Sequence, residues 1–430
     1  MIEEGSSSVP SSPLQYLSLV ALSPGFGSSY PWLKELKPEE RGLCLIHLLL
    51  ACANHVVAGN MESANVTFEH ISLLASPTGD TMQRIAAYFT EAFADRLVKG
   101  YAGVHKALNS TTMSCSLDNI LVRRLFFDLL PFLKVSYLVT NQAILEATNG
   151  EMMVHIIDLH SSEPAQWISL LQALSSRPEG PPHLRITAEQ KGVLDYMATQ
   201  LNKEAEILDI PFQFNPVISK LEEVDVESLR VKTGEALVIN SVLQLHTLLA
   251  KNNDFFLQKL VDFPEVSSSD LPKLDAFLKA LCRLSPKLMV VTEQESNHNG
   301  ASLMERVMES LNFYAALFDC LESTNSRASS ERHKLEKMMF GAEIKNIIAC
   351  EGIERKVRHE KLEKWVKRIK LAGFCSMPLS YNGLLLARRF LHSNSYQWYN
   401  IKEDNGCFVI CWQDRPLYSI SAWRFRMMYD

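Results

Sequence analysis

Two acidic side chains stand where short apolar runs of the sequence end. Asp158 closes the run Met153–Asp158, and Glu189 follows the next such run. A carboxylate at the end of a buried strand can hold a ribose hydroxyl in adenosylmethionine- and dinucleotide-binding enzymes. The loop 159–165 contains no glycine and carries Glu163, so its backbone cannot closely approach a phosphate or carboxylate group. We therefore expect Asp158 to cap the next helix or brace the core, and we expect no cofactor.

The other potentially reactive residues lack the sequence patterns of a catalytic site or a metal site. His155 lies in the middle of an apolar run, as a buried core histidine does. His160 and Ser162 share a loop, but the chain has no G-x-S-x-G elbow to expose a nucleophilic serine. Cys407 and Cys411 are not joined by a second pair of ligands, so they do not fit the pattern of a zinc site. The sequence predicts neither catalytic residues nor a metal site.

Two polar segments remain. Glu293–Gly300 (E-Q-E-S-N-H-N-G) could form a ligand or metal site, although we favour a hydrogen-bonded loop at the edge of a sheet. Glu354–Lys370 is rich in Lys and Arg, and as a helix it would pair Glu with Lys four residues on, which is typical of a solvated face. It is also the best candidate for contacting phosphate groups, through Arg355, Lys356, Arg358 and Lys361.

Composition limits the class of protein. The 430 residues are 47% hydrophobic and 21% charged, which provides for a sizeable core and excludes a wholly disordered chain. The net charge of −6 disfavours binding of bulk nucleic acid. Nine scattered cysteines indicate reduced thiols of an intracellular protein rather than a disulfide framework. No stretch has the flanks of a signal peptide or an uninterrupted membrane-spanning length, so we expect no membrane contact.

The elements that would position these residues fall into three parts. Residues 1–37 form a short tail rich in Ser, Pro and Gly. Residues 38–150 have helical periodicity, and Asp80 with Gln83 resembles a capping box at a helix start. From residue 151 to residue 430, short apolar runs alternate with helical patterns, which predicts βαβ units and a mostly parallel sheet.

The strands of this sheet are expected at Met153–Asp158, 184–187, 236–239 and 288–292, with an antiparallel hairpin over 408–412 and 417–423. We therefore expect an α/β fold in which a helical cap covers a doubly wound core. The helices of the cap carry more apolar face than one helical layer can hide, which predicts an interface with another helical surface. The candidate partner-binding residues are Leu45, Leu48, Leu49, Phe68, Phe89 and Phe93.

Several strings in this order resemble the GRAS family of plant transcriptional regulators over about residues 38–427. V-H-I-I-D spans Val154–Asp158, and the loop after it resembles one branch of the family in particular. The residues that match the family's motifs are Val154, His155, Ile156, Ile157, Asp158, Gln166, Trp167, Pro286, Phe313, Tyr314, Glu343, Ser421, Ala422 and Trp423. Ala165, Ala342 and the string Thr187-Ala188-Glu189 differ from what is common in the family, and we expect these departures to lie around the would-be cofactor pocket.

The resemblance implies a nuclear, non-enzymatic coregulator with a Rossmann-like, methyltransferase-like core. It implies contacts with other GRAS proteins through the helical cap and with zinc-finger transcription factors of the indeterminate-domain type, so that DNA is reached indirectly. The branch implies a role in gibberellin signalling and root development. Two alternatives stay open: an adenosylmethionine-dependent methyltransferase or small-molecule-binding protein on the same fold, and direct DNA binding through the basic helix around Trp365.

Overall fold

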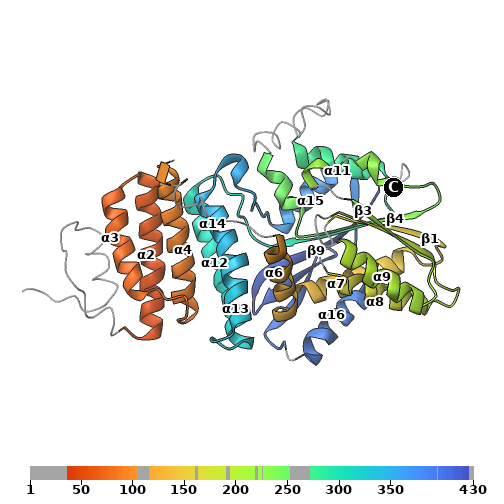
Figure 1. Cartoon of the computed structure of the whole chain (residues 1–430), viewed down its shortest axis with the longest axis horizontal. Helices are drawn as coiled ribbons and strands as arrows, with labels where there is room; N and C mark the ends of the chain where they lie inside the picture. The colour runs from red at the N-terminus through yellow and green to blue at the C-terminus, as the bar shows by residue number, and fades with distance from the viewer. Residues whose placement is uncertain are drawn as a thin grey trace, which may run out of the picture. The chain divides into compact units, whose positions relative to one another are not determined.

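The computed structural model describes residues 36–101, 103, 104, 106, 116–159, 163–189, 194–217, 221–224, 226–251, 272–394 and 396–425 (Figure 1). The predicted tail lies outside these residues except for its last two positions, and so do His160 and Ser162.

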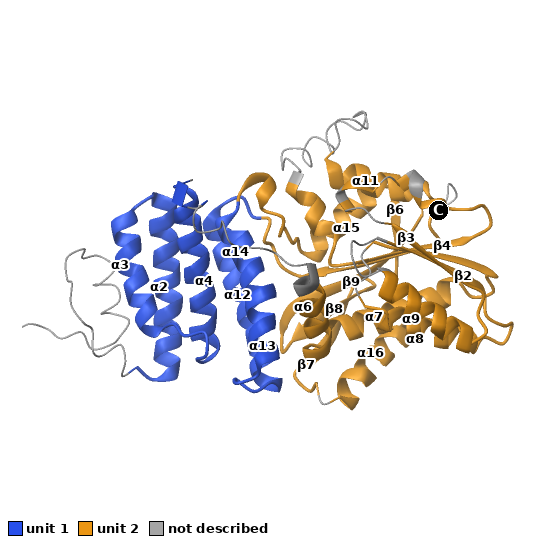
Figure 2. Ribbon diagram, in the orientation of Figure 1, with its two compact units in different colours: residues 1–112, 300–350 blue, residues 113–299, 351–430 orange. Residues whose placement is uncertain are grey.

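The chain divides into two compact units, which Figure 2 shows in different colours. Unit 1 comprises residues 1–112 and 300–350, and unit 2 comprises residues 113–299 and 351–430. This division differs from the predicted boundary at residue 150. Residues 113–150 group with the sheet, and a distant helical segment completes the N-terminal unit, which periodicity along the sequence cannot reveal.

The described part of unit 1 is helical. Helix α2 (Pro38–Ala58) is capped at its C-terminus by Gly59, whose φ of 69° is the left-handed conformation that glycine adopts without strain. Asp80 and Gln83 form the predicted capping box, in which the Gln83 backbone N–H donates to Asp80 Oδ1 over 3.0 Å. The elements are α2 (Pro38–Ala58), α3 (Met61–Leu74), α4 (Thr81–Lys99), α12 (Leu303–Thr324), α13 (Ser330–Leu335), the π-helix η5 (Glu336–Gly341) and α14 (Ala342–Ala349).

Helix α2 is long and apolar enough to cross a membrane by length and composition, the only such helix in the described part of the chain. Its apolar face, however, is buried, and α2 packs against α3, α4 and α12. That arrangement is typical of a core helix, so the length of α2 is weak evidence for a membrane span.

A buried ion cluster ties the two chain segments of unit 1 together. Arg84 Nε donates to Glu336 Oε2 over 2.9 Å, and Arg332 Nε donates to Glu336 Oε1 over 2.8 Å. All three side chains are fully buried. Beside the cluster, a Cβ on Gly341 would lie 2.7 Å from the Tyr88 ring, so this end of the π-helix requires glycine.

Unit 2 is built on a nine-stranded sheet with the order β3-β2-β1-β4-β5-β9-β8-β7, in which β6 also pairs with β9. The strands β1 to β5 are parallel, and β6 to β9 join in antiparallel register. Their bounds are β1 Met153–Asp158, β2 His183–Glu189, β3 Phe212–Val217, β4 Ala236–Val242, β5 Leu288–Gln294, β6 Phe374–Met377, β7 Tyr399–Asp404, β8 Cys407–Trp412 and β9 Arg415–Phe425.

Helices cover both faces of this sheet (Figure 1). One layer contains α6 (Ser116–Leu129), α7 (Phe132–Ala147), α8 (Ala165–Ser175), α9 (Leu194–Ile207) and α16 (Tyr381–Ser393). The opposite layer contains α11 (Lys273–Arg283) and α15 (Leu362–Leu371). The 3₁₀ turns η2 (Leu221–Glu223), η3 (Val226–Leu229) and η4 (Leu245–Lys251) pack into the same core cluster as these two helices, and η6 (Gly352–Glu354) contacts η4. Strands β1, β4 and β5 are buried on both faces, which explains why they read as short apolar runs.

The predicted α/β class, the parallel strands and the β8–β9 hairpin are confirmed. β9 extends the sheet because it pairs antiparallel with β5, with Met289 opposite Trp423. The predicted helix over Glu354–Lys370 is wrong in its first half, since residues 355–361 form an extended connection and α15 begins at Leu362.

Candidate functional site

The carboxyl end of β1 is occupied by a hydrogen-bonded brace. Trp167 Nε1 donates to Asp158 Oδ2 over 2.9 Å, and Asn240 Nδ2 donates to Asp158 Oδ1 over 3.2 Å. Asp158 is 2% exposed, and both partners are 1% exposed. The carboxylate therefore connects β1 to β4 and to α8, and protein donors occupy both of its oxygens. This geometry agrees with the bracing role expected from the glycine-free loop.

The start of α8 is held by a second pair of amides. Asn141 Nδ2 donates to the Gln166 carbonyl over 2.9 Å, and Gln166 Nε2 lies 3.4 Å from Asn141 Oδ1. Both residues are buried. Helix α7 thereby fixes the residue next to Trp167, which in turn fixes the indole that reaches Asp158.

His155 is a neutral core histidine. Arg185 Nη2 lies 2.9 Å from His155 Nδ1, and because guanidinium only donates, Nδ1 accepts and the Nε2 proton goes to Thr187 Oγ1 at 2.8 Å. Burial, followed by the charge of Arg185, lowers the pKa of His155 to about 4. Arg185 Nε also donates to Glu235 Oε1 over 2.9 Å. The nearby Glu235 carboxylate therefore pairs with arginine and leaves the histidine uncharged.

Three further histidines gather where β4 and β5 end. His246 Nδ1 lies 2.9 Å from Glu293 Oε2, and His298 Nδ1 lies 2.9 Å from His359 Nδ1. Burial, with the neighbouring His246 as the next cause, lowers the pKa of His298 to about 3 and holds that of His359 well below its ordinary value. An imidazole pair joined through Nδ1 needs one donor and one acceptor, so this hydrogen bond requires a neutral ring.

The polar segment after β5 and the basic segment bind each other. Asn299 Nδ2 donates to Glu360 Oε1 over 2.8 Å, and Arg358 Nη1 donates to Asn299 Oδ1 over 2.9 Å. Arg368 Nε completes the network with a 2.7 Å bond to Glu360 Oε2. Arg355 Nη1 donates to the His298 carbonyl over 2.9 Å. The favoured interpretation of the 293–300 segment as a hydrogen-bonded loop agrees with this network.

These bonds require a correction to the phosphate-contacting candidates. Arg355 and Arg358 are 5% and 6% exposed, and their guanidinium groups hold loops of unit 2. They cannot also reach a phosphate at the surface. Lys356 and Lys361 are exposed, so only these two of the four candidates stay accessible.

The C-terminal motif residues lie in the centre of the sheet. Trp423 is fully buried in the core on the α11 and α15 side, and its Nε1 donates to Ser421 Oγ over 2.9 Å. Ala422 is also fully buried. Pro286 precedes β5, and its carbonyl accepts the Phe425 N–H over 3.2 Å, which fixes the end of β9.

The remaining motif residues lie in unit 1. Tyr314 OH donates to Glu343 Oε2 over 2.7 Å, which joins α12 to α14. Tyr314 is fully buried and Phe313 is 4% exposed. Two motif residues that are 29 positions apart are thus hydrogen-bonded partners, as part of the packing of this unit.

The candidate partner-binding set also needs correction. Leu45, Leu49, Phe89 and Phe93 are fully buried, and Leu48 is 7% exposed, because the apolar stripes of α2 and α4 face the interior of unit 1. Phe68 is half-buried. Helical periodicity identified the packed face correctly, but a packed face is not available to a partner.

Sequence reasoning missed the partners of the motif residues. Glu235, Asn240 and His359 belong to no string that was singled out in the sequence, and each is brought in from another strand or loop. One signal was present: buried polar residues inside apolar runs, such as Asn240 in β4, require partners. Among the described residues, no group of His, Cys, Asp or Glu is arranged to hold a metal ion.

The fold and the hydrogen-bonded ends of β1, β4 and β5 define a class of protein. It is a methyltransferase-like α/β protein whose polar groups at these strand ends bind one another, and it carries a helical unit made of two separate chain segments. Residues 45–424 match the model of the GRAS domain family, and the chain belongs to this family.

Three relatives extend the assignment. The chain is 57% identical to Scarecrow-like protein 3 of Arabidopsis thaliana, with 99% of this chain and 98% of that protein covered. It is 35% identical to chitin-inducible gibberellin-responsive protein 2 of Oryza sativa subsp. japonica, with 88% and 68% covered. The crystal structure of SCL7 in Oryza sativa superposes with a TM-score of 0.76 at 28% identity, covering 88% of this chain and 99% of that one. The protein is a plant transcriptional regulator similar to Scarecrow-like protein 3, and it is not an enzyme.

Proposed function

We propose that this protein is a nuclear coregulator that acts on transcription through protein–protein contacts. Its partners are other GRAS proteins, bound through the helical unit, and DNA-bound zinc-finger factors of the indeterminate-domain type, bound through the α/β unit. The pathway is gibberellin signalling and root development, which the branch resemblance and the gibberellin-responsive relative support.

The observation that carries the proposal is the closed end of β1. In an adenosylmethionine-dependent enzyme of this fold, the strand-end carboxylate would be directed at the ligand. In this chain Asp158 accepts hydrogen bonds from Trp167 and Asn240 instead. Because the polar groups at the strand end are hydrogen-bonded to one another, they favour a protein that binds partners through its surface over one that transforms a substrate.

The helical contact would use the exposed side of α2. Leu43 and Val57 are 51% and 58% exposed, and His47 and Asn54 are exposed between them. With half-buried Leu50 these residues form one stripe, in which successive members are four, three, four and three positions apart along the chain. This is the spacing of the contact seam between paired helices. The members in chain order are Leu43, His47, Leu50, Asn54 and Val57. This stripe replaces the buried candidates as the proposed contact surface.

The experiment combines a reporter with co-precipitation from plant nuclei. We expect a reporter response only when the zinc-finger factor is co-expressed, and we expect Leu43→Glu with Val57→Glu to abolish capture of a GRAS partner. Met308→Glu is the matched control, because Met308 is 57% exposed on α12 in the same unit. A sequence-specific mobility shift by the purified chain alone, at nanomolar protein and physiological salt, would mean that it reads DNA itself and would end the coregulator proposal.

The methyltransferase alternative has its own test. Calorimetric titration with adenosylmethionine should give a dissociation constant no tighter than about 1 mM, because the strand-end carboxylate is engaged and the loop lacks glycine. Micromolar binding would favour the alternative over the coregulator proposal.

A further inference from the structure

Among the described strands, one edge strand of the unit 2 sheet, β3, has a pairing partner on one side only. Strand β3 is the first in the strand order, and it pairs with β2 on one side, with Leu184 opposite Phe212. The Leu184 N–H donates to the Pro211 carbonyl over 2.9 Å, so residues 211, 213 and 215 direct their backbone groups toward β2. Phe212, Phe214 and Pro216 therefore direct theirs outward, and no described strand pairs with them there.

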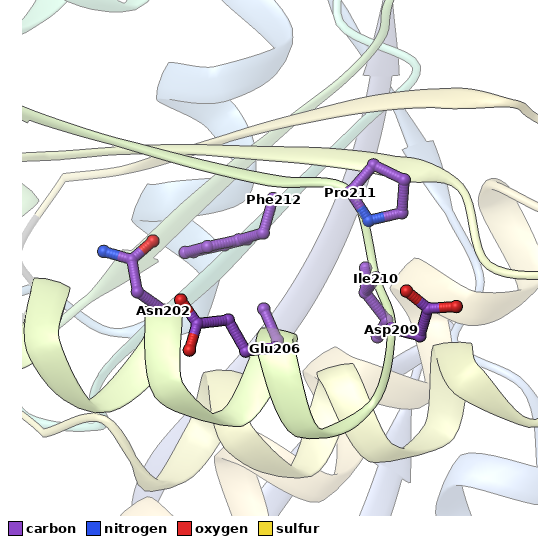
Figure 3. A pocket seen from close by; sticks show the side chains of 7 residues that line it. Asn202, Glu206, Asp209, Ile210, Pro211 and Phe212 are labelled. Carbon is purple, nitrogen blue, oxygen red and sulfur yellow. The ribbon is translucent and has the colours of Figure 1, made fainter.

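A pocket of about 420 Å³ lies at the amino end of this edge. Figure 3 shows Asn202 and Glu206 rising from helix α9 toward the Phe212 ring, with Asp209 and Pro211 on the connection to β3. Buried Ala205 and Ile210 line it as well, so that the pocket combines an apolar base with exposed polar groups at its rim.

The charges at the pocket are all of one kind. Helix α9 ends here, where the Ile210 N–H donates to the Ala205 carbonyl over 3.0 Å. A helix C-terminus is the negative pole of the helix dipole, and it usually attracts Lys or Arg. This one instead carries the exposed carboxylates of Glu206 and Asp209. A cation in the pocket would complement both carboxylates and the helix end.

We propose that the β3 edge binds an extended segment of a partner protein by strand addition, and that a Lys or Arg side chain of this segment enters the pocket. Outward N–H and C=O groups of Phe212 and Phe214 would supply the backbone pairing. The aliphatic stem of the cation would lie on Phe212 and Ile210, while its charged end reaches Glu206 and Asp209. Pro216 lacks an N–H at an outward position, so the added strand is short.

This site is separate from the α2 stripe and from the strand ends at Asp158, so it extends the proposed function and does not depend on it. The co-precipitation variants described above lie on α2, and the reporter tests dependence on the zinc-finger factor without any change at the β3 edge. If the peptide does not bind the β3 edge, the reporter and co-precipitation results still stand. If the reporter or the co-precipitation fails, binding at the β3 edge can still be tested.

The probe is a fluorescein-labelled peptide of about nine alternating threonine and valine residues with one central lysine, titrated with the full chain by fluorescence anisotropy. We expect saturable binding that weakens by about tenfold in the double variant Glu206→Gln, Asp209→Asn, since two partly exposed ion pairs are lost. Asparagine tolerates the left-handed backbone that Asp209 adopts at φ 51°, so the variant should fold, and its melting temperature checks this. Glu403→Gln on the opposite edge strand β7 is the control and should bind as the unmodified chain does.

Two control peptides separate the contributions. A peptide with glutamate in place of lysine should not bind, because its charge repels the Glu206 and Asp209 carboxylates. A peptide with alternate amides N-methylated along one of its edges should not bind either, because it cannot form the backbone hydrogen bonds to β3. The proposal is overturned if either control peptide binds the chain as tightly as the lysine peptide, or if the double variant binds the lysine peptide as tightly as the unmodified chain. It is also overturned if lysine amide competes with the probe as strongly as the unlabelled peptide does. Dimerisation of the chain that excludes the probe would assign the edge to a second copy and overturn it too.

Discussion

Replacing Asp158 by alanine tests whether the end of β1 is a brace or a ligand site. The change leaves the Trp167 indole N–H and the Asn240 amide N–H without an acceptor, in surroundings where both residues are 1% exposed. Each buried donor left unsatisfied costs about 1–3 kcal/mol. We therefore expect Asp158→Ala to lower the free energy of unfolding by about 3–5 kcal/mol, measured by urea denaturation followed by circular dichroism.

The amide replacement should behave differently. Asn240 Oδ1 has no hydrogen-bond partner among the described residues, so the Asn240 amide can turn over. In Asp158→Asn the new carbonyl can still accept from Trp167, and the new NH₂ can donate to Asn240 Oδ1. This variant should lose only the charge-assisted part of the bonds, about 1–2 kcal/mol.

A double-mutant cycle with Trp167→Phe isolates the indole bond. Phenylalanine brings no donor, so Asp158→Ala should cost about 1–2 kcal/mol less in that background than in the unmodified chain. If Asp158→Ala unfolds at the midpoint of the unmodified chain while binding of a ligand or partner is lost, the bracing argument is refuted. The carboxylate would then have to be assigned to a binding site.

Three further predictions concern other parts of the molecule. Trp423→Ala should cost about 3–5 kcal/mol and leave little folded protein, because this indole is fully buried in the sheet core; a normal melting temperature would contradict this. Arg368→Ala should destabilise the fold by about 3–5 kcal/mol because it removes the buried guanidinium that pairs with the Glu360 carboxylate. Lys367→Ala on the exposed side of α15 should have little effect in the same thermal melt. Burial lowers the folded-state pKa of His155 to about 4 and that of His298 to about 3, below the value of 6.5 in the unfolded chain, so the unfolded chain binds more protons between these values. The free energy of unfolding should be constant well above pH 6.5 and should fall by about 2 kcal/mol for each histidine at pH 5. A urea midpoint that does not change over this range would contradict the neutral assignment.

Several elements could be predicted from the sequence because their signal is local. The apolar run of β1 is bounded as predicted, and the Asp80–Gln83 capping box marks the start of α4. β3 gives a weaker signal, since it is an edge strand whose exposed and half-buried residues include Pro216. β7 is also an edge strand, and half of its residues are exposed. Edge strands need no continuous apolar run, so their patterns merge with those of loops.

The candidate site was predictable only in part, because its bonds join residues far apart in the chain. The absence of glycine after β1 led us to expect that Asp158 caps a helix or braces the core, but nothing near Asp158 identifies Asn240, 82 positions later, as its partner. The basic segment was ambiguous for the same reason. Its arginines and lysines look alike in sequence, and only the contact with Asn299 separates the buried Arg358 from the exposed Lys356.

The discontinuity of unit 1 has a consequence for synthesis on the ribosome. Arg84 meets Glu336 across 252 positions, so α2 to α4 leave the ribosome long before the helices that cover them exist. At a translation rate of about 5–20 residues per second, the delay is on the order of 10–50 s. During that time the apolar stripes of α2 and α4 depend on chaperones or on transient burial. Chains that stop before residue 350 can never complete this unit, so nascent fragments should be recognised as unfinished and degraded.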